Sequence, residues 1–416
     1  MQLKSYKYRI YPNEEQKEML NKHFGCVRFV YNWALETKQK LYKEENKSIS
    51  CFDLINKLKS ELKEENEWLS EVNSQSLQQA IKNCDTAYKN FFKNKKGFPK
   101  FKNKKSKQSF QCPQHCIVNF SGQLISIPKV KDIRAVFHRK FNGKIKTVTI
   151  SKNNLNQYFA SVLVESDTFD VPLKESTIEG TVGIDTGIKS LAVCSNGGLF
   201  ESKHFAKSQK RKMKLKQRRL AKKKKNSIQY NKYKHQIAKL SLHLSNQRND
   251  YLDKITHKLV NENQIDTICV ESLKTNFMIK NHNLAYDAID NSIYNFYTKL
   301  KYKCKEHGIN YVEIDKFYPS SKTCSKCGYI KKDLKLNERY WICPICGEFH
   351  DRDYNASVNI KNVGYQALCM ERAKVKSVEY PTMDDRCGNN LKSSGIMKQN
   401  KRVSKTHEAH KPLVCW

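Results

Sequence analysis

The sequence is short of acidic residues for its length. It has 41 Asp and Glu against 77 Lys and Arg, which gives a formal net charge of +36 at pH 7. A folded protein with such an excess repels itself unless a polyanion balances it. A genome rich in A and T would raise the content of Lys, but it would raise the content of Asp and Glu as well. The imbalance therefore favours a nucleic acid as the partner.

Long apolar runs are also missing. No stretch approaches the ~18 apolar residues of a membrane-spanning helix, and residues 1–15 contain no hydrophobic signal core. We therefore expect a soluble, cytoplasmic protein with no membrane partner. Fifteen cysteines in such a chain favour reduced thiols and metal ligation over a disulfide framework.

Hydrophobic patterning predicts several structural segments, and 416 residues are too many for one core. The opening LKSYKYRIYP alternates like a strand that stops at Pro12, and Asn13 with Gln16 then resembles a helix capping box. Residues 52–92 contain no Gly or Pro and predict further helix. Short β-like runs between residues 123 and 166 predict a small antiparallel barrel or sheet.

Two long tracts, Thr86–Lys131 and Ser202–Asn249, contain no Asp or Glu. In the first, lysines are interleaved with phenylalanines. Such lysines can follow a phosphate backbone while the aromatic rings stack on bases, although a solvated charged loop has the same composition. The second has seventeen Lys and Arg, many of them on an expected helix. Their like charges would destabilise the isolated helix, so we expect it to form best against phosphates. The expected nucleic-acid contacts are Lys95, Lys96, Lys100, Lys102, Arg211, Lys212, Lys214, Lys216, Arg218 and Arg219.

Four cysteines have the spacing of a zinc site. Two C-x2-C pairs are separated by fifteen residues, and each pair can form a knuckle around one tetrahedral ion. Free thiols are the alternative. Four thiolates leave no open coordination position, so the ion would be structural. The expected ligands are Cys324, Cys327, Cys343 and Cys346. Cys112 and Cys116 lack a matching pair, and we expect His350 to be a neighbour of the cluster and not a ligand.

Three acidic residues stand where predicted elements begin or end. Asp185 and Glu271 each end a predicted buried strand, and Asp353 opens a predicted helix just after the last cysteine pair. Strand ends and helix starts meet at one edge of an α/β sheet. Three carboxylates there could hold two Mg²⁺ or Mn²⁺ ions roughly 3.5–4 Å apart, the arrangement that cleaves phosphodiesters. Each acid could instead cap a turn or a helix.

The chain resembles the TnpB family, the OrfB-type proteins of bacterial insertion sequences that are related to compact type V CRISPR nucleases. The resemblance covers about residues 3–363. It rests on the segments YKYRIYPNEEQ, GIDTGIKSLAV, VESLKTNFM, FYPSSKTCSKCG and CPICGEFHDRDYNASVNI. Two departures, Thr186 for an aliphatic residue and Ser357 for an alanine, remove no expected ligand.

The resemblance implies a multidomain α+β and α/β fold. An N-terminal oligonucleotide-binding-type β-barrel with an inserted helical domain would precede an RNase H-like (RuvC) nuclease domain with an inserted zinc ribbon. The expected boundaries are 1–12 for the first barrel strand, 13–95 for the helical recognition domain, 96–178 for the rest of the barrel, 179–320 for the first part of the nuclease, 321–349 for the zinc ribbon, 350–375 for the last part of the nuclease, and 376–416 for a basic polar tail expected to be disordered.

The resemblance also implies an RNA-guided DNA endonuclease encoded by a bacterial insertion sequence, associated with the nucleoid. Asp185, Glu271 and Asp353 would be the catalytic acids, and Asp351 would not. The implied cofactors are one structural Zn²⁺ and two catalytic Mg²⁺ or Mn²⁺. The implied partners are a guide RNA derived from the mobile element and double-stranded target DNA, bound by a monomer or homodimer. Two alternatives stay open: a non-cleaving nucleic-acid-binding accessory or regulator of transposition, and a conventional three-acid transposase.

Overall fold

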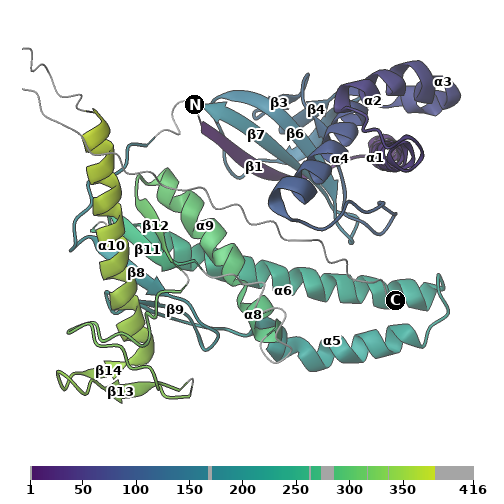
Figure 1. Cartoon of the computed structure of the whole chain (residues 1–416). Coiled ribbons are helices and arrows are strands. Elements are labelled where there is room, and N and C mark those ends of the chain that lie inside the picture. The colour runs from purple at the N-terminus through teal and green to yellow at the C-terminus, as the bar shows by residue number, and fades with distance from the viewer. Residues whose placement is uncertain are drawn as a thin grey trace, which may run out of the picture. The chain divides into compact units, whose positions relative to one another are not determined.

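The structure is a computed structural model that describes residues 2–166, 171–261, 264–272, 285–315, 317–335 and 337–379 (Figure 1). Contacts divide the chain into two units, Met1–Cys369 and Met370–Trp416. Both large sheets and all the expected site residues belong to the first unit. Most of the expected tail at 376–416 lies outside the described residues, as do residues 273–284 after the second acid.

An antiparallel sheet combines the N-terminal strand with strands from much later in the chain. β1 (Gln2–Tyr11) pairs with β7 (Tyr158–Ser166) on one side and with β5 (Val130–Val136) on the other. The full order is β2-β6-β7-β1-β5-β4-β3, with β2 at Gln108–Cys112, β3 at Ile117–Asn119, β4 at Leu124–Ile127 and β6 at Lys144–Lys152. Alternate residues of β7 are buried, so one face of the sheet forms a core. The sheet joins the expected segment 1–12 to strands within 96–178.

The helices between β1 and β2 pack on this sheet and share its core. α1 (Glu14–Glu45) begins at the expected capping box, in which the side chains of Asn13 and Gln16 accept from each other's backbone N–H at 2.8 and 2.9 Å. The helix expected over 52–92 is interrupted. It divides into α2 (Cys51–Lys57), a π-helical turn at Leu58–Leu62, α3 (Lys63–Glu65), a 3₁₀ turn at Glu67–Glu71 and α4 (Ser74–Asn94).

A second, five-stranded sheet carries the first two acids. Its order is β10-β9-β8-β11-β12, with β8 at Thr181–Asp185, β9 at Ser190–Cys194, β10 at Leu199–Glu201, β11 at Thr267–Glu271 and β12 at Asn310–Ile314. β8, β9 and β10 pair antiparallel, whereas β8, β11 and β12 run parallel. The first four residues of both β8 and β11 are buried, as expected for strands covered on both faces.

Helices cover the two faces of the second sheet. The covering helices include α6 (Ile228–Asn261), α9 (Ile293–Glu306) and α10 (Arg352–Glu379). α8 (Ala285–Asn291) precedes α9, and α5 (Phe205–Ala221) packs on α6 and α8 and buries no residue of its own. Apolar residues of α6 and α9 form one core with β8 and β11, while Ile360 of α10 packs with Cys269 and Ile314 in another. A Cβ at Gly183 of β8 would collide with the carbonyl of Ser357, so this glycine lets α10 lie directly against the strand.

The segment expected from the sequence to be a zinc ribbon, called the ribbon below, contains β13 (Tyr340–Ile342), which pairs antiparallel with β14 (Phe349–Asp351) directly before α10. Among the described residues, no helix is both long and apolar enough to cross a membrane. The architecture is a mixed α/β fold of several segments with a curled antiparallel sheet, and this part of the expected fold class is confirmed.

Candidate metal centres and nucleic-acid surface

Three elements bring the three acids to one edge of the second sheet. β8 and β11 are parallel neighbours, with Ile184 opposite Val270, so Asp185 and Glu271 follow at the same end. Asp353 lies in the first turn of α10, the helix that packs against β8 at Gly183. Sequence reasoning could predict this edge because carboxyl ends of parallel strands meet there.

The electrostatics of Asp185 show that the acids act on one another. Desolvation, followed by the negative charges of Asp353 and Glu271, raises the pKa of Asp185 to about 7. Desolvation also raises the pKa of Glu271. Carboxylates held together in this way favour a proton or a bound cation, and oxygen ligands suit Mg²⁺ or Mn²⁺. The residues therefore fit a divalent ion by charge and by ligand type.

The third acid has a basic partner that sequence reasoning missed. Arg339 Nη1 donates to both carboxylate oxygens of Asp353 at 3.2 Å. Among the described residues, only the four cysteines bring three or more ligand atoms within 4.8 Å of one another, so the acids are spaced more widely. Arg339 precedes β13, and the pairing of Tyr340 with Asp351 sets it beside the start of α10. That hairpin register has no signature in the sequence.

Asp351 has a structural task. Its Oδ1 accepts from the backbone N–H groups of Asp353 and Tyr354, both at 3.0 Å. These are two of the first N–H groups of α10, which have no partner within the helix. Asp351 therefore caps α10, so the carboxylate of Asp353 is not used as the cap and instead pairs with Arg339.

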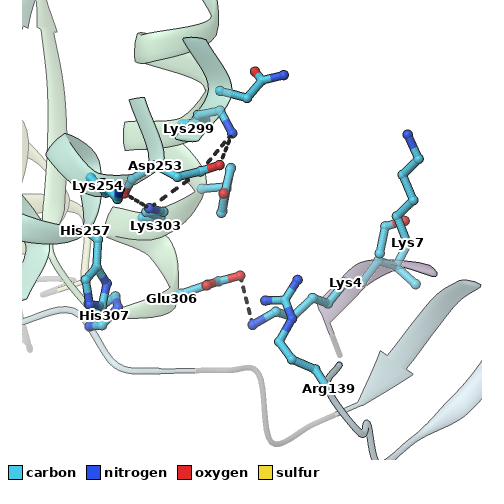
Figure 2. A pocket seen from close by; sticks show the side chains of 14 residues that line it. Lys4, Lys7, Arg139, Asp253, Lys254, His257, Lys299, Lys303, Glu306 and His307 are labelled. Atoms are coloured by element: carbon cyan, nitrogen blue, oxygen red, sulfur yellow. Dashed lines mark hydrogen bonds and ion pairs between the residues drawn. The ribbon is translucent and has the colours of Figure 1, made fainter. Parts of the chain in front are cut away.

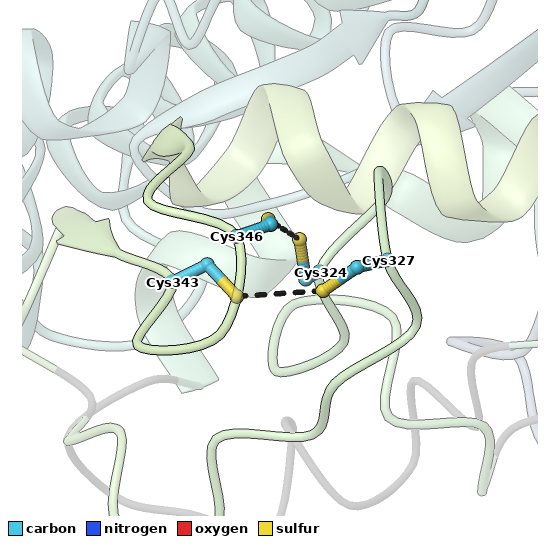
Figure 3. A group of neighbouring side chains, drawn as sticks. All are labelled: Cys324, Cys327, Cys343 and Cys346. Atoms are coloured by element: carbon cyan, nitrogen blue, oxygen red, sulfur yellow. Dashed lines mark hydrogen bonds between the residues drawn. The ribbon is translucent and has the colours of Figure 1, made fainter.

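The four cysteines of the ribbon form a compact cluster (Figure 3). The Sγ atoms of Cys324 and Cys346 lie 3.6 Å apart, and those of Cys327 and Cys343 lie 3.5 Å apart. Zinc–sulfur bonds of about 2.3 Å in a tetrahedron require sulfur spacings of about 3.8 Å. The spacing and the donor set therefore fit a tetrahedral ion held by four thiolates.

Both knuckles have the same backbone form. Gly328 N donates to the carbonyl of Cys324, and Gly347 N donates to that of Cys343, each at 2.9 Å. The two glycines have φ of +78° and +69°, values that favour Gly. His350 Nε2 lies 3.0 Å from Cys324 Sγ, so this imidazole neighbours the cluster.

Buried asparagines connect the first knuckle to α10. Asn355 Oδ1 accepts from Ser325 N at 3.0 Å, and its Nδ2 donates to the carbonyl of Thr323 at 2.7 Å. Asn359, one turn further, donates to the same carbonyl at 2.7 Å. Because Asn355 follows Asp353 by two residues, the position of the knuckle and that of the third acid depend on each other.

The structure places the ten expected nucleic-acid contacts in two groups, of which eight side chains are exposed. Lys102 is partly buried, with Nζ 3.6 Å from the centre of the Tyr31 ring. Lys216 is also partly buried and donates to Gln236 of α6 at 2.6 Å. The exposed ones are Lys95, Lys96, Lys100, Arg211, Lys212, Lys214, Arg218 and Arg219. α5 has no buried residue, so its basic side chains are open to a partner.

Other lysines of this part of the chain are engaged in structural ion pairs. Figure 2 shows Asp253 of α6 between two lysines of α9. Lys299 Nζ lies 2.8 Å from each Asp253 oxygen, and Lys303 Nζ lies 3.8 Å from Oδ1. These pairs join α6 to α9, and they distinguish structural lysines from exposed lysines of α5 such as Lys212 and Lys214.

Models of known families match three parts of the chain. A model described as "Probable transposase", OrfB of IS605 elements, matches residues 161–282, and one described as "Cas12f1-like, TNB domain" matches residues 294–360. A third, "Helix-turn-helix domain" of OrfB, matches residues 1–47. Over its described residues, 2–47, the structure has β1 and the single continuous helix α1.

Two curated relatives align with most of the chain. A "Putative RNA-guided DNA endonuclease" of Streptomyces pristinaespiralis is 34% identical over 88% of this chain and 90% of its own length. "Putative RNA-guided DNA endonuclease InsQ" of Escherichia coli is 30% identical over 88% of this chain and 93% of its own length. A protein chain from a solved Cas12f1–sgRNA–target DNA complex aligns with 87% of this chain over 99% of its own length, with a TM-score of 0.48 and 15% identity. The chain belongs to the TnpB family, the OrfB proteins of IS605-type insertion sequences.

Proposed function

We propose that the protein is an RNA-guided endonuclease that cuts double-stranded DNA with one two-metal site formed by Asp185, Glu271 and Asp353. The observation that carries this proposal is the meeting of the three acids at one sheet edge, from β8, β11 and α10. The names of the two relatives support the RNA guide and the DNA target.

The strand arrangement supports an RNase H-like nuclease domain. Three antiparallel strands are followed by two parallel ones, and the acids end the central strand and its parallel neighbour. The curled seven-stranded sheet with helices inserted after its first strand supports the expected oligonucleotide-binding domain.

When bound, two Mg²⁺ or Mn²⁺ ions supply an activated water and stabilise the leaving oxygen of a phosphodiester. The protein residues prepare that chemistry. Asp185 and Glu271 present carboxylates from fixed strand ends. Asp351 caps α10 so that Asp353 completes the set, and Arg339 holds the Asp353 carboxylate from the ribbon side. The four-cysteine cluster would hold one structural Zn²⁺ and so fix the segment before the third acid.

The charge distribution supports a guide RNA. A guided nuclease needs a wide basic channel for the backbone of an RNA–DNA heteroduplex. The exposed basic side chains of α5 and of residues 95–100 provide two basic surfaces outside the ribbon, and we propose that they line such a channel. Sequence choice is then left to base pairing between the guide and the target.

The proposal is tested by alanine substitution of each acid in protein purified with its bound RNA. Asp185→Ala, Glu271→Ala and Asp353→Ala should each abolish Mg²⁺-dependent cleavage and leave the yield of bound RNA unchanged. Wild-type protein that binds nucleic acid without cutting would instead support the accessory or regulator. A donor–target strand-transfer assay covers the third candidate, because a three-acid transposase would join strands where an endonuclease leaves free ends.

A further inference from the structure

The turn that follows the first acid is held by a buried amide from another element. After Asp185 the chain turns through Gly187 and Ile188 into β9. Asn291 Nδ2, at the end of α8, donates to the carbonyls of Gly187 and Ile188 at 3.3 and 2.9 Å. It also donates to Ser202 Oγ at 2.8 Å. Asn291 is only 6% exposed, so loss of this amide would leave the two carbonyls without a nearby water to replace the lost hydrogen-bond donor.

A second contact holds the same turn from α9. The hydroxyls of Thr186 and Tyr297 lie 2.6 Å apart, and Thr186 is buried. Desolvation, together with the charges of Asp185 and Glu271, raises the pKa of Tyr297, so this phenol lies within electrostatic reach of both acids. Asn291 and Tyr297 therefore hold the turn at successive residues directly after Asp185.

The residue before Asn291 holds a different element. Asp290 is 3% exposed and accepts from the backbone N–H of Ala206 at 3.0 and 2.9 Å and of Lys207 at 3.2 Å. These groups are at the start of α5, where His204, the residue before the helix, provides no side-chain cap. Arg248 Nε of α6 lies 3.6 Å from the same carboxylate. Asp290 thus caps the basic helix α5 from α8.

Asp290 and Asn291 are adjacent residues at the corner between α8 and α9, and their side chains contact two different elements. α8 ends at Asn291, and Ser292 has a φ of +51° before α9 begins. The carbonyl of Ser292 accepts from Asn295 N at 2.8 Å and from Phe296 N at 3.1 Å. Because neighbouring residues of a hydrogen-bonded corner move together, a shift of α5 that moves Asp290 also moves Asn291.

We propose that Asn291 and Tyr297 are positioning residues for Asp185, and that Asp290 makes their position depend on helix α5. Nucleic acid bound to α5 would then change the affinity of the acids for their metal. The inference rests on the proposed function, because it treats Asp185 as a metal ligand and α5 as a nucleic-acid surface. None of the three residues is itself a ligand.

The first test measures binding of Mn²⁺ alone to the zinc-loaded full chain by electron paramagnetic resonance of the free ion. Tyr297→Phe and Asn291→Ala should each weaken binding about 10-fold, the effect typical of residues that orient metal ligands. Tyr294→Phe is the matched control on α9, since Tyr294 is 69% exposed. The double variant Thr186→Val with Tyr297→Phe should bind Mn²⁺ no more weakly than either single variant, because both substitutions remove the same hydrogen bond. Wild-type Mn²⁺ affinity in Tyr297→Phe, which keeps the ring and its packing, would overturn the positioning role.

The second test repeats the Mn²⁺ titration with and without an RNA–DNA heteroduplex of about 20 base pairs. The same titration of Asp185→Asn protein with the duplex measures how much Mn²⁺ the duplex itself binds, and this background is subtracted. The heteroduplex should change the Mn²⁺ affinity of the wild type several-fold, but not that of Asp290→Asn. Asp250→Asn is the control, because Asp250 is an exposed acid of α6 that pairs with Lys254, and it should respond like the wild type. A wild-type response in Asp290→Asn that binds the duplex normally would overturn the link to α5. Failure of the wild type to bind the duplex would contradict that link and the proposed function together, while the Tyr297 result would still decide the positioning role.

Discussion

Asp351 and Asp353 are two residues apart in the chain and have different partners. Asp351 accepts two backbone N–H groups of α10, whereas Asp353 faces Arg339 and adds its charge to the environment of Asp185. The sequence allowed both carboxylates to be helix caps. Only the start of the helix and the hairpin before it separate the two tasks.

Substitution of these two acids should therefore have opposite effects. Asp351→Ala removes the cap of α10 and should destabilise the fold by about 1 kcal/mol, with cleavage retained. Asp353→Ala should abolish cleavage and leave the thermal midpoint nearly unchanged. Thermal unfolding and Mg²⁺-dependent cleavage of a plasmid target measure both effects. Cleavage at the wild-type rate by Asp353→Ala would show that this acid is not a ligand.

The raised pKa of Asp185 has a consequence for stability. An unfolded Asp releases its proton near pH 4, whereas folding raises the pKa of Asp185 to about 7. Between these values the folded state binds more protons than the unfolded state, so increasing pH lowers the free energy of unfolding. Asp185→Asn should raise the thermal midpoint at pH 8 in buffer without added Mg²⁺, and the gain should shrink towards pH 4. A gain of equal size at both pH values would contradict the assignment.

At the scale of elements, the sequence predicted strands and helices best where a local signal was strong. The Asn13 capping box marked the start of α1, and Gly308, with a φ of +66°, follows the end of α9, where the backbone favours glycine. The helix expected over 52–92 was wrong between Asn66 and Asn73. Asn66 leaves the helical conformation and donates to the carbonyl of Leu62, and Asn73 caps α4. No Gly or Pro marks this break, and asparagine occurs both within helices and at their ends. The sequence therefore contained no clear signal for it.

The ribbon is an element whose fold should depend on metal. Elemental analysis should find about one zinc per chain, because four thiolates hold one tetrahedral ion. Cys343→Ser should lower the zinc content and the cleavage rate, since the knuckles fix the segment that Asn355 joins to α10. Cys369→Ser is the matched control, because Cys369 is exposed and lies outside the cluster. Folded, active protein without zinc would contradict the prediction.

The basic helix α5 should contribute to affinity through charge alone. Replacing Lys212, Lys214 and Arg218 by Gln should weaken RNA binding and reduce the slope of log K against log salt by about 0.7 per lost contact to a single strand. A control variant with Lys40, Lys43 and Lys47 replaced by Gln has the same change in charge in a tract that also contains acids. The same salt slope in both variants would show that α5 makes no specific contribution.

At the scale of the whole molecule, composition predicted the class of partner and motif spacing predicted the candidate centres. The order of domains came from the resemblance, because periodicity does not show that β1 completes a sheet whose other strands begin at Gln108. Arg339, Asn291 and Tyr297 also could not be predicted. Their positions depend on which distant elements pack together, and no local pattern records that.

The central claim is that a bound RNA directs the cut, and exchange of the guide tests it most directly. Protein purified from its host should carry a defined RNA with a variable 3′ segment. Replacing that segment should move Mg²⁺-dependent double-strand cleavage to the matching DNA and away from the original target. Equal cleavage by RNA-free protein, or cleavage that ignores the new segment, would contradict the account and leave a nonspecific nuclease.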